Sequence, residues 1–279
     1  PQTFAREHWG GRLPLLTRAA ELPRDFDDLL STSHVDELLS ERGGVRAPFI
    51  RVAKEGGLVT RDAYLGPAGF GAEMPDQVDS AKVLAQFASG ATIVLQGAAP
   101  AVASCDRLRP GGWSTTWGHP VQANAYVTPP QNRGFDPHYD VHDVFVLQTS
   151  GTKHWTVHEP VHVDPPLPSQ PWTDHRDAIA RRVKDDEPVV DAVLNPGDAL
   201  YLPRGGWIHS ARALGQTSVH LTIGVSAVTG MDVIRAVVDQ LEGVADFRRS
   251  LPMGVDMTDQ SEMVATTTKL VAELAERLR

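Results

Sequence analysis

The segment from Gly134 to Trp155 constrains the fold of this chain most strongly. It reads GFDPHYDVHDVFVLQTSGTKHW and opens with His138-Tyr139-Asp140. Alternate residues of a β-strand lie on the same face of the sheet, so His138 and Asp140 point the same way and Tyr139 points away. An imidazole and a carboxylate on one face are two potential ligands of a metal ion. The segment therefore predicts β-structure that carries part of a metal site.

A third ligand is expected from a distant part of the chain, and His209 is the candidate. A turn at residues 195–198, a short strand and a second turn at residues 203–206 precede it. Two histidines and one carboxylate on one side of a metal leave its other positions open, which is typical of non-haem Fe(II) oxygenases. Structural zinc sites prefer four closed protein ligands, so zinc is disfavoured.

The runs around these residues predict a barrel. In Val121–Val127 the polar residues Asn124 and Tyr126 share one face and apolar residues share the other, a pattern that suits the lining of a pocket inside a barrel. The two halves of the candidate metal site also resemble the paired signatures of cupin barrels. We expect a mainly β fold with helical additions: a double-stranded β-helix with N-terminal α/β elements and a C-terminal helical region.

Hydrophobic spacing and turn residues predict the other elements. A helix includes Leu29 to Leu39, with a capping box at Ser33 and Asp36. Further helices are expected at 79–89, within 98–117 and after Gly230, and strands at 47–52, 91–96, 138–148, 153–157, 189–194, 199–202 and 217–225. The strand that starts at the candidate ligands and ends at Gln148 is expected to form a hairpin with 153–157. Residues 158–187 are Pro-rich and charged, and we expect a long loop that faces the substrate.

This pattern suggests three parts. Residues 1–90 buttress the barrel, residues 91–228 form the barrel, and residues 229–279 form a helical region. The two apolar stripes of that last region suit a dimer interface or packing against the barrel.

Lys153 lies on the strand after the first two candidate ligands. As a solvated residue it has no role in the site. As a buried residue, its ammonium group would pair with the distal carboxylate of a dicarboxylic co-substrate. Tyr126, Asn124 and Ser226 would supply neutral hydrogen bonds to the same region.

The segments VQANAYVTPPQNRGFDPHYDVHDVFVLQTSGTKHW, FASGATIVLQG and LNPGDALYLPRGGWIHSA resemble the JmjC-type ribosomal oxygenases, a branch of the cupin-fold 2-oxoglutarate oxygenases. The resemblance covers most of the chain. It implies a jelly-roll JmjC barrel with Fe(II) held by His138, Asp140 and His209. It also implies 2-oxoglutarate held by Lys153 with Tyr126, helped by Asn124 and Ser226.

The same resemblance implies consumption of O2 and hydroxylation of a side chain of a ribosomal protein. It further implies a helical dimerisation region followed by a winged-helix-like domain, which this sequence lacks. The 158–187 segment is longer and more Pro-rich than the family pattern, which bears on the identity of the substrate.

Composition excludes several other classes. The formal charge of −9 disfavours sequence-independent binding of nucleic acid. The single cysteine, Cys105, excludes an internal disulfide and fits a reducing compartment. No apolar run approaches the roughly 18 residues that span a membrane, and no signal peptide is evident, so a cytoplasmic location is expected.

Three functions are therefore compatible with the sequence. The first is an Fe(II)- and 2-oxoglutarate-dependent hydroxylase of a ribosomal protein. The second is the same chemistry on a small molecule or amino acid. The third is a metal-binding cupin module without catalytic activity, against which Lys153 and Tyr126 argue, because a structural metal needs no carboxylate anchor.

Overall fold

The computed structural model describes most of the chain and divides it into two compact units, Pro1–Val228 and Thr229–Arg279. The described residues are 2–10, 12–21, 26–40, 45–67, 76–97, 118–167, 169–250, 253–254, 256 and 258–277. The helix expected within residues 98–117 lies outside them. None of the helices in these ranges combines the length and the apolar character that crossing a lipid bilayer requires.

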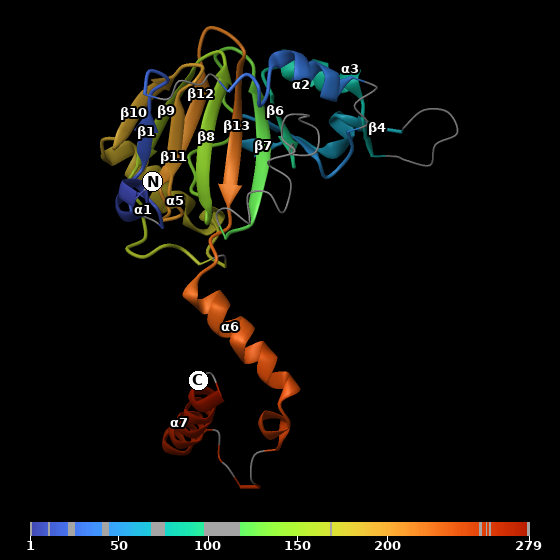
Figure 1. Cartoon of the computed structure of the whole chain (residues 1–279). Coiled ribbons are helices and arrows are strands. Elements are labelled where there is room, and N and C mark those ends of the chain that lie inside the picture. The colour runs from blue at the N-terminus through green and yellow to red at the C-terminus, as the bar shows by residue number, and fades with distance from the viewer. Residues whose placement is uncertain are drawn as a thin grey trace. The chain divides into compact units, whose positions relative to one another are not determined.

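Two antiparallel sheets form the first unit (Figure 1). The larger sheet has the order β1 (Leu15–Thr17), β11 (Ala199–Leu202), β8 (Asp143–Ser150), β13 (Ser218–Val225), β7 (Val121–Thr128), β6 (Thr92–Gln96), β2 (Ile50–Lys54) and β3 (Gly57–Leu58). The smaller sheet has the order β10 (Val190–Leu194), β9 (Lys153–His158) and β12 (Ile208–Ala213). A two-stranded sheet pairs β4 (Leu65–Gly66) with β5 (Gln77–Val78).

A hydrophobic core fills the space between the two main sheets. Val144 and Val146 of β8 pack there with Trp155 and Val157 of β9 and with Leu200 of β11. Their side chains are almost fully buried, and each contributes roughly 1.5–3 kcal/mol by leaving water. Two packed sheets with the chain passing between them form a jelly roll, so the predicted fold class is confirmed.

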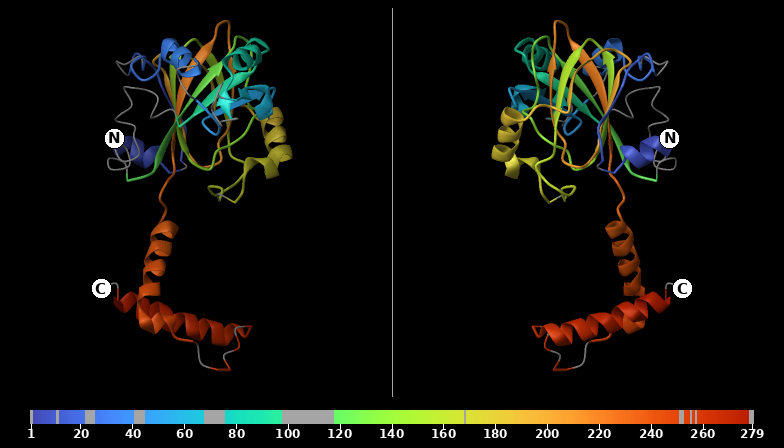
Figure 2. Two further views of the ribbon diagram at one scale, coloured as in Figure 1. Left: turned by 90° about the vertical axis from the view of Figure 1, so that its right-hand side faces the viewer. Right: turned by 90° about the vertical axis from the view of Figure 1, so that its left-hand side faces the viewer.

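A second core lies on the outer face of the larger sheet. There α2 (Thr32–Leu39) and α3 (Ser80–Ala88) pack with β6, β7 and β13 (Figures 1 and 2). Both helices have side-chain caps: Asp79 begins α3, and Ser31 begins α2 in a capping box with His34. The predicted capping pair of Ser33 and Asp36 is therefore wrong, because the N-cap lies two residues earlier in the sequence, at Ser31.

The predicted hairpin between residues 138–148 and 153–157 is also wrong. β8 pairs with β11 and β13, whereas β9 pairs with β10 and β12. The chain crosses from one sheet to the other at Gly151, which has a φ of +63°. A tight turn therefore joins two strands that are not neighbours, as a jelly roll requires.

Residues 158–187 contain a helix that the Pro-rich composition concealed. A short 3₁₀ turn, η3 (Trp172–His175), leads into α5 (Arg176–Asp185). Ile179 of α5 is buried against Tyr139 and Ile208. This segment therefore packs against Tyr139, the residue between the candidate ligands His138 and Asp140.

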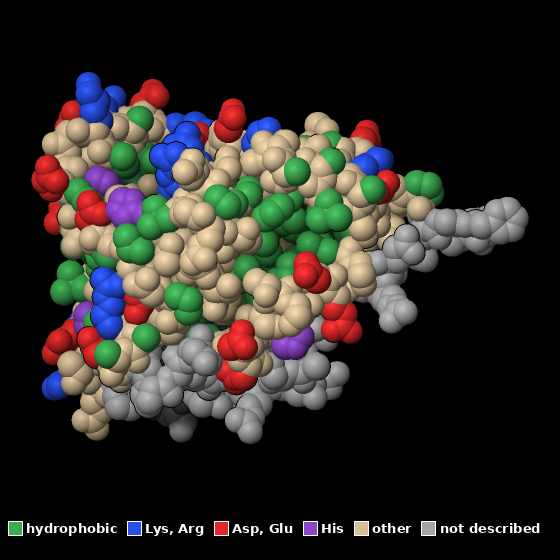
Figure 3. Space-filling view, turned by 90° about the horizontal axis from the view of Figure 1, so that it is seen from above, with side chains coloured by type: hydrophobic (Ala, Val, Ile, Leu, Met, Phe, Trp, Pro, Cys, Tyr) green, Lys and Arg blue, Asp and Glu red, His purple; other side chains and the backbone are tan. Residues whose placement is uncertain are grey.

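Two shorter helical elements complete the first unit, and four helical elements lie among the described residues of the second. The former are α1 (Gln2–Glu7) and η1 (Arg61–Ala63). The latter are α6 (Gly230–Gln240), the turns η4 (Leu241–Gly243) and η5 (Ala245–Arg248), and α7 (Gln260–Arg277). On the face seen in Figure 3, acidic and basic side chains are interspersed around a central group of apolar ones.

Gly151→Ala is expected to destabilise the protein by at least about 2 kcal/mol, because an L-residue is strained at positive φ and its Cβ would meet Thr217 O at 2.0 Å. Gly215→Ala is the control, since nothing lies within 4 Å of a Cβ there. Urea unfolding measures both variants. Equal free energies of unfolding would contradict this account of the crossing.

Candidate metal centre and its cavity

His138 and His209 are joined by a backbone bridge. The nitrogen of His138 donates to the oxygen of His209 at 3.2 Å, and the reverse bond is 2.8 Å long. The bridge links the extended segment before β8 to the start of β12. It brings the two imidazole rings to a centroid distance of 4.5 Å. Thus the structure brings together two residues that are 71 positions apart in numbering, 138 and 209.

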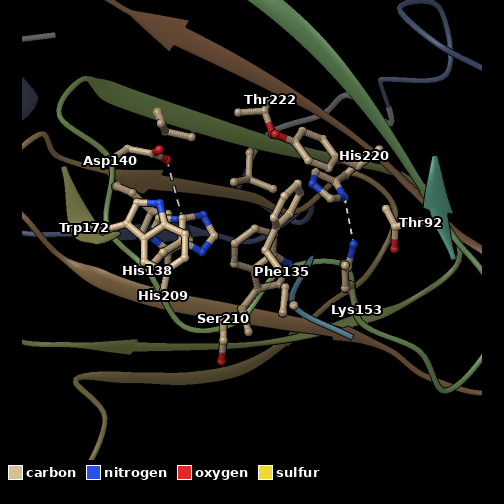
Figure 4. Close-up of a pocket in the computed structure, with 18 of the residues that line it drawn as sticks. Thr92, Phe135, His138, Asp140, Lys153, Trp172, His209, Ser210, His220 and Thr222 are labelled. Carbon is tan, nitrogen blue, oxygen red and sulfur yellow. Dashed lines mark hydrogen bonds and ion pairs between the residues drawn. The ribbon is translucent and has the colours of Figure 1, made fainter. Parts of the chain in front are cut away.

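Asp140 completes a cluster of three potential ligands. Its Oδ2 lies 3.6 Å from His209 Nε2. The ligand atoms of His138, Asp140 and His209 all lie within 4.8 Å of one another (Figure 4). The carboxylate precedes β8 rather than lying within it, since that strand starts at Asp143. The three side chains nevertheless converge on one point.

Backbone carbonyls orient both imidazoles. His138 Nδ1 lies 2.7 Å from Asp136 O, and His209 Nδ1 lies 3.1 Å from Trp207 O. These contacts fit an N–H at Nδ1 and leave the Nε2 lone pair for a metal, as in known metal sites.

The charges at this site suit a cation. Burial, and then the neighbouring His138, lower the pKa of His209 to about 4, so its imidazole is neutral at neutral pH. Burial raises the pKa of Asp140, but the charges of His209, His138, His142 and Arg51 outweigh it and hold the pKa below its ordinary value. Two imidazoles and one carboxylate that converge on one point fit a divalent transition metal.

The three residues line a cavity of about 480 Å³. The walls come from both main sheets, from the segment before β8 and from η3 and α5. Trp172 of η3 lies with its ring 5.7 Å from that of His138, and the guanidinium of Arg176 lies over the Trp172 ring at 4.3 Å. The segment that we expected to face the substrate therefore forms one wall of this cavity.

Lys153 also lines the cavity (Figure 4). It is 3% exposed, and its Nζ lies 2.8 Å from Thr128 Oγ1 and 3.4 Å from His220 Nδ1. Burial lowers the pKa of Lys153 to about 7. Within the described residues no carboxylate is paired with this ammonium group. A buried cation of this kind is matched to an anionic ligand.

Tyr126 lines the same region of the cavity. Its ring stacks on that of His220 with a centroid distance of 4.8 Å and an interplanar angle of 6°. Burial, and to a smaller extent the charge of Asp140, raise the pKa of Tyr126 to about 12. The phenol is therefore a neutral hydrogen-bond donor at physiological pH.

The structure does not bring Asn124 and Ser226 to the cavity. Asn124 is buried on β7, but its Oδ1 accepts from Gly97 N at 3.2 Å, and it is not among the lining residues. Ser226 is exposed beyond the end of β13.

Sequence reasoning missed Thr128 and His220 as parts of this region. Thr128 follows Tyr126 by two residues on the same strand, so period-two alternation was a signal for its inward direction. His220 pairs with Tyr126 across β7 and β13. That register is a long-range property, and no local pattern predicted it.

Several known proteins are similar to this chain in sequence. The family model of the JmjC domain matches residues 114–233. The chain is similar to ribosomal oxygenase 1 of Gallus gallus, with 32% identity over 237 residues that cover 80% of this chain and 34% of that protein. It is also similar to the bifunctional lysine-specific demethylase and histidyl-hydroxylase NO66 of Brugia malayi, with 39% identity over 55% of this chain and 22% of the relative. The chain thus spans a third or less of these relatives.

Solved structures show the same fold. The X-ray structure of E. coli ycfD has a TM-score of 0.57 at 18% identity and covers 99% of this chain and 67% of that chain. The structure of the E. coli ribosomal oxygenase YcfD in complex with cobalt and 2-oxoglutarate has a TM-score of 0.53 at 18% identity, with coverages of 99% and 66%. The family model and the sequence relatives show that residues 114–233 match the JmjC domain and that the chain is similar to the JmjC ribosomal oxygenases, and the solved structures show the shared fold.

Proposed function

We propose that this chain is an Fe(II)- and 2-oxoglutarate-dependent oxygenase that hydroxylates a side chain of a ribosomal protein. One observation carries the proposal: three converging metal ligands and a buried lysine without a carboxylate partner line the same cavity. The names of the relatives, ribosomal oxygenase and histidyl-hydroxylase, support the choice of a protein side chain. The buried ammonium group argues against a non-catalytic metal-binding module.

His138, Asp140 and His209 would hold the metal through Nε2, a carboxylate oxygen and Nε2. The bound ion would supply activation of O2 for the oxidation of a C–H bond, coupled to decarboxylation of 2-oxoglutarate. The chain's own part is to orient the imidazoles through Asp136 and Trp207, and to keep the remaining positions open.

Lys153 would bind the distal carboxylate of 2-oxoglutarate. Tyr126 and Thr128 are the neutral partners that we assign to this carboxylate. Thr128 Oγ1 lies 2.8 Å from Lys153 Nζ, and Tyr126 lines the cavity and stacks on His220, the other contact of the lysine. His220 lines the cavity beside Lys153 and Tyr126, and burial, followed by the charge of Lys153, holds its pKa well below the ordinary value. The imidazole therefore stays neutral and does not repel the ammonium group.

Asp140→Ala is expected to weaken Fe(II) binding by more than about 100-fold, because even second-shell partners of metal ligands contribute 10–100-fold. An anaerobic titration with Fe(II) and then 2-oxoglutarate measures this through the visible charge-transfer band of the chelate. The wild type should develop the band and the variant should not. Asp136→Ala is the control that keeps all three ligands, since only its backbone oxygen contacts His138. A wild type that binds Fe(II) without developing the band would contradict the proposed function.

Binding of 2-oxoglutarate is expected to weaken about tenfold per pH unit above pH 7. The free Lys153 has a pKa of about 7. A bound carboxylate raises this pKa, so above pH 7 the protein must take up a proton when it binds, whereas below pH 7 the lysine is already charged. Calorimetry of the Mn(II)-loaded protein in buffers of different ionisation enthalpy measures both the affinity and the proton uptake.

Lys153→Met is the matched variant for that measurement. It should bind 2-oxoglutarate at least about 30-fold more weakly, because a buried charge pair loses one partner, and it should lack the pH slope. A slope that persists in Lys153→Met would assign the titration to another group.

The second unit is the region to which we assign dimerisation. Large apolar side chains of α6 are exposed within this unit, among them Met231 at 54% and Ile234 at 57%. Isologous pairing of such a face would bury it. Light scattering of the wild type should therefore give twice the chain mass of 30.3 kDa. The double variant Ile234→Asp/Val238→Asp should give the single mass, and a monomeric wild type would defeat this assignment.

A further inference from the structure

Arg51 belongs to a row of inward-facing residues that crosses the larger sheet. It pairs with Val94 of β6, Val94 pairs with Tyr126 of β7, and Tyr126 pairs with His220 of β13. Residues opposite one another in an antiparallel sheet point to the same face. Arg51 therefore points towards the same side as Tyr126 and lines the cavity.

Among the residues that the structure describes, the guanidinium group of Arg51 has no hydrogen-bond or ion-pair partner. Its Nε is buried and makes no hydrogen bond, and within the described residues no ion pair or hydrogen bond of this side chain is present. Burial of an unpaired donor on a cation is costly unless a ligand supplies the acceptor. The group is also close enough to act electrostatically on Asp140 and on Tyr126. An anion near the metal centre is therefore the partner that fits it.

The charged residues that line the cavity are unbalanced. Arg51, Lys153 and Arg176 are cationic, and Asp140 is the one carboxylate among the described lining residues. On the proposed function, a divalent ion, Asp140, Lys153 and doubly negative 2-oxoglutarate cancel one another in charge. The metal and Lys153 also occupy both carboxylates of the co-substrate. Arg176 is exposed and stacks on Trp172. The half-buried charge of Arg51 therefore remains for the other ligand of the cavity, the substrate.

We infer that Arg51 is a substrate subsite that binds the carboxylate of an Asp or Glu residue next to the hydroxylated side chain. This inference rests on the proposed function, because it assigns 2-oxoglutarate to Lys153. A guanidinium group binds a carboxylate through two parallel N–H···O bonds, which fixes the orientation of the peptide as well as its charge. Peptides that place Lys, methyl-lysine or Arg at this subsite are repelled.

The test uses the full chain loaded with Mn(II) and 2-oxoglutarate, which does not turn over. The probe is a library of blocked hexapeptides with one position varied at a time, and the peptides that the protein retains are identified by mass spectrometry. The wild type should retain Asp or Glu over Asn or Gln by about tenfold at one position, as expected for a charge-assisted pair. Arg51→Gln should lose this preference, and Arg51→Lys should keep part of it. Arg61→Gln, at an exposed arginine outside the cavity, should behave as the wild type.

Three results would overturn the inference. The first is a wild type that shows no preference for Asp or Glu. The second is an Arg51→Gln variant that keeps this preference. The third is an Arg51→Gln variant that binds 2-oxoglutarate as weakly as Lys153→Met, which would assign Arg51 to the co-substrate. Thermal unfolding of each variant shows whether a lost preference comes from misfolding. If Arg51→Gln is misfolded, Arg51→Lys is the variant that tests the inference. A wild type that does not bind 2-oxoglutarate would defeat the proposed function instead.

Discussion

The backbone bridge between His138 and His209 is the constraint on which the metal centre depends. Its two hydrogen bonds fasten the segment before β8 to the first residues of β12, and the strands β8 and β12 belong to different sheets. The jelly roll is what allows this, because its chain passes repeatedly from one sheet to the other. With the bridge formed, the short side chain of Asp140 is long enough to place its carboxylate beside both imidazoles. The order of the ligands in the sequence is thus a consequence of the order of the strands.

Burial has opposite effects on the two ends of the cavity. At the metal end it keeps the imidazole of His209 neutral and so available as a ligand. At the other end burial lowers the pKa of Lys153, whose hydrogen-bond partners among the described residues are a hydroxyl and a neutral imidazole. The same low-dielectric environment therefore favours a metal ion at one end and a carboxylate at the other. A dicarboxylic 2-oxo acid has both the chelating group and the distal charge that such a cavity requires.

Local patterns predicted much of this structure, but not its long-range pairing. Alternation along Val121–Val127 and the His-x-Asp spacing are properties of a few neighbouring residues, and they predicted the inward face of β7 and the candidate ligands. The hairpin failed because a short turn after β8 says nothing about which sheet receives β9. The helix α5 was not predicted, because the prolines before it suggested a loop throughout residues 158–187. Arg51 and His220 reach the cavity through strand register, which a single sequence does not reveal.

Tyr139, the residue between the first two ligands, faces away from the cavity and has a separate importance. It is 1% exposed, packs with Ile179 and donates its hydroxyl hydrogen to Gln170 O at 2.9 Å. The 158–187 segment is thus attached to the side of the ligand segment that faces away from the cavity, while its Trp172 and Arg176 line the cavity. Such an attachment allows the wall of the cavity to diverge in evolution while the ligands stay in place. Related barrels can then acquire new substrates by exchanging this one segment, without rebuilding the metal centre.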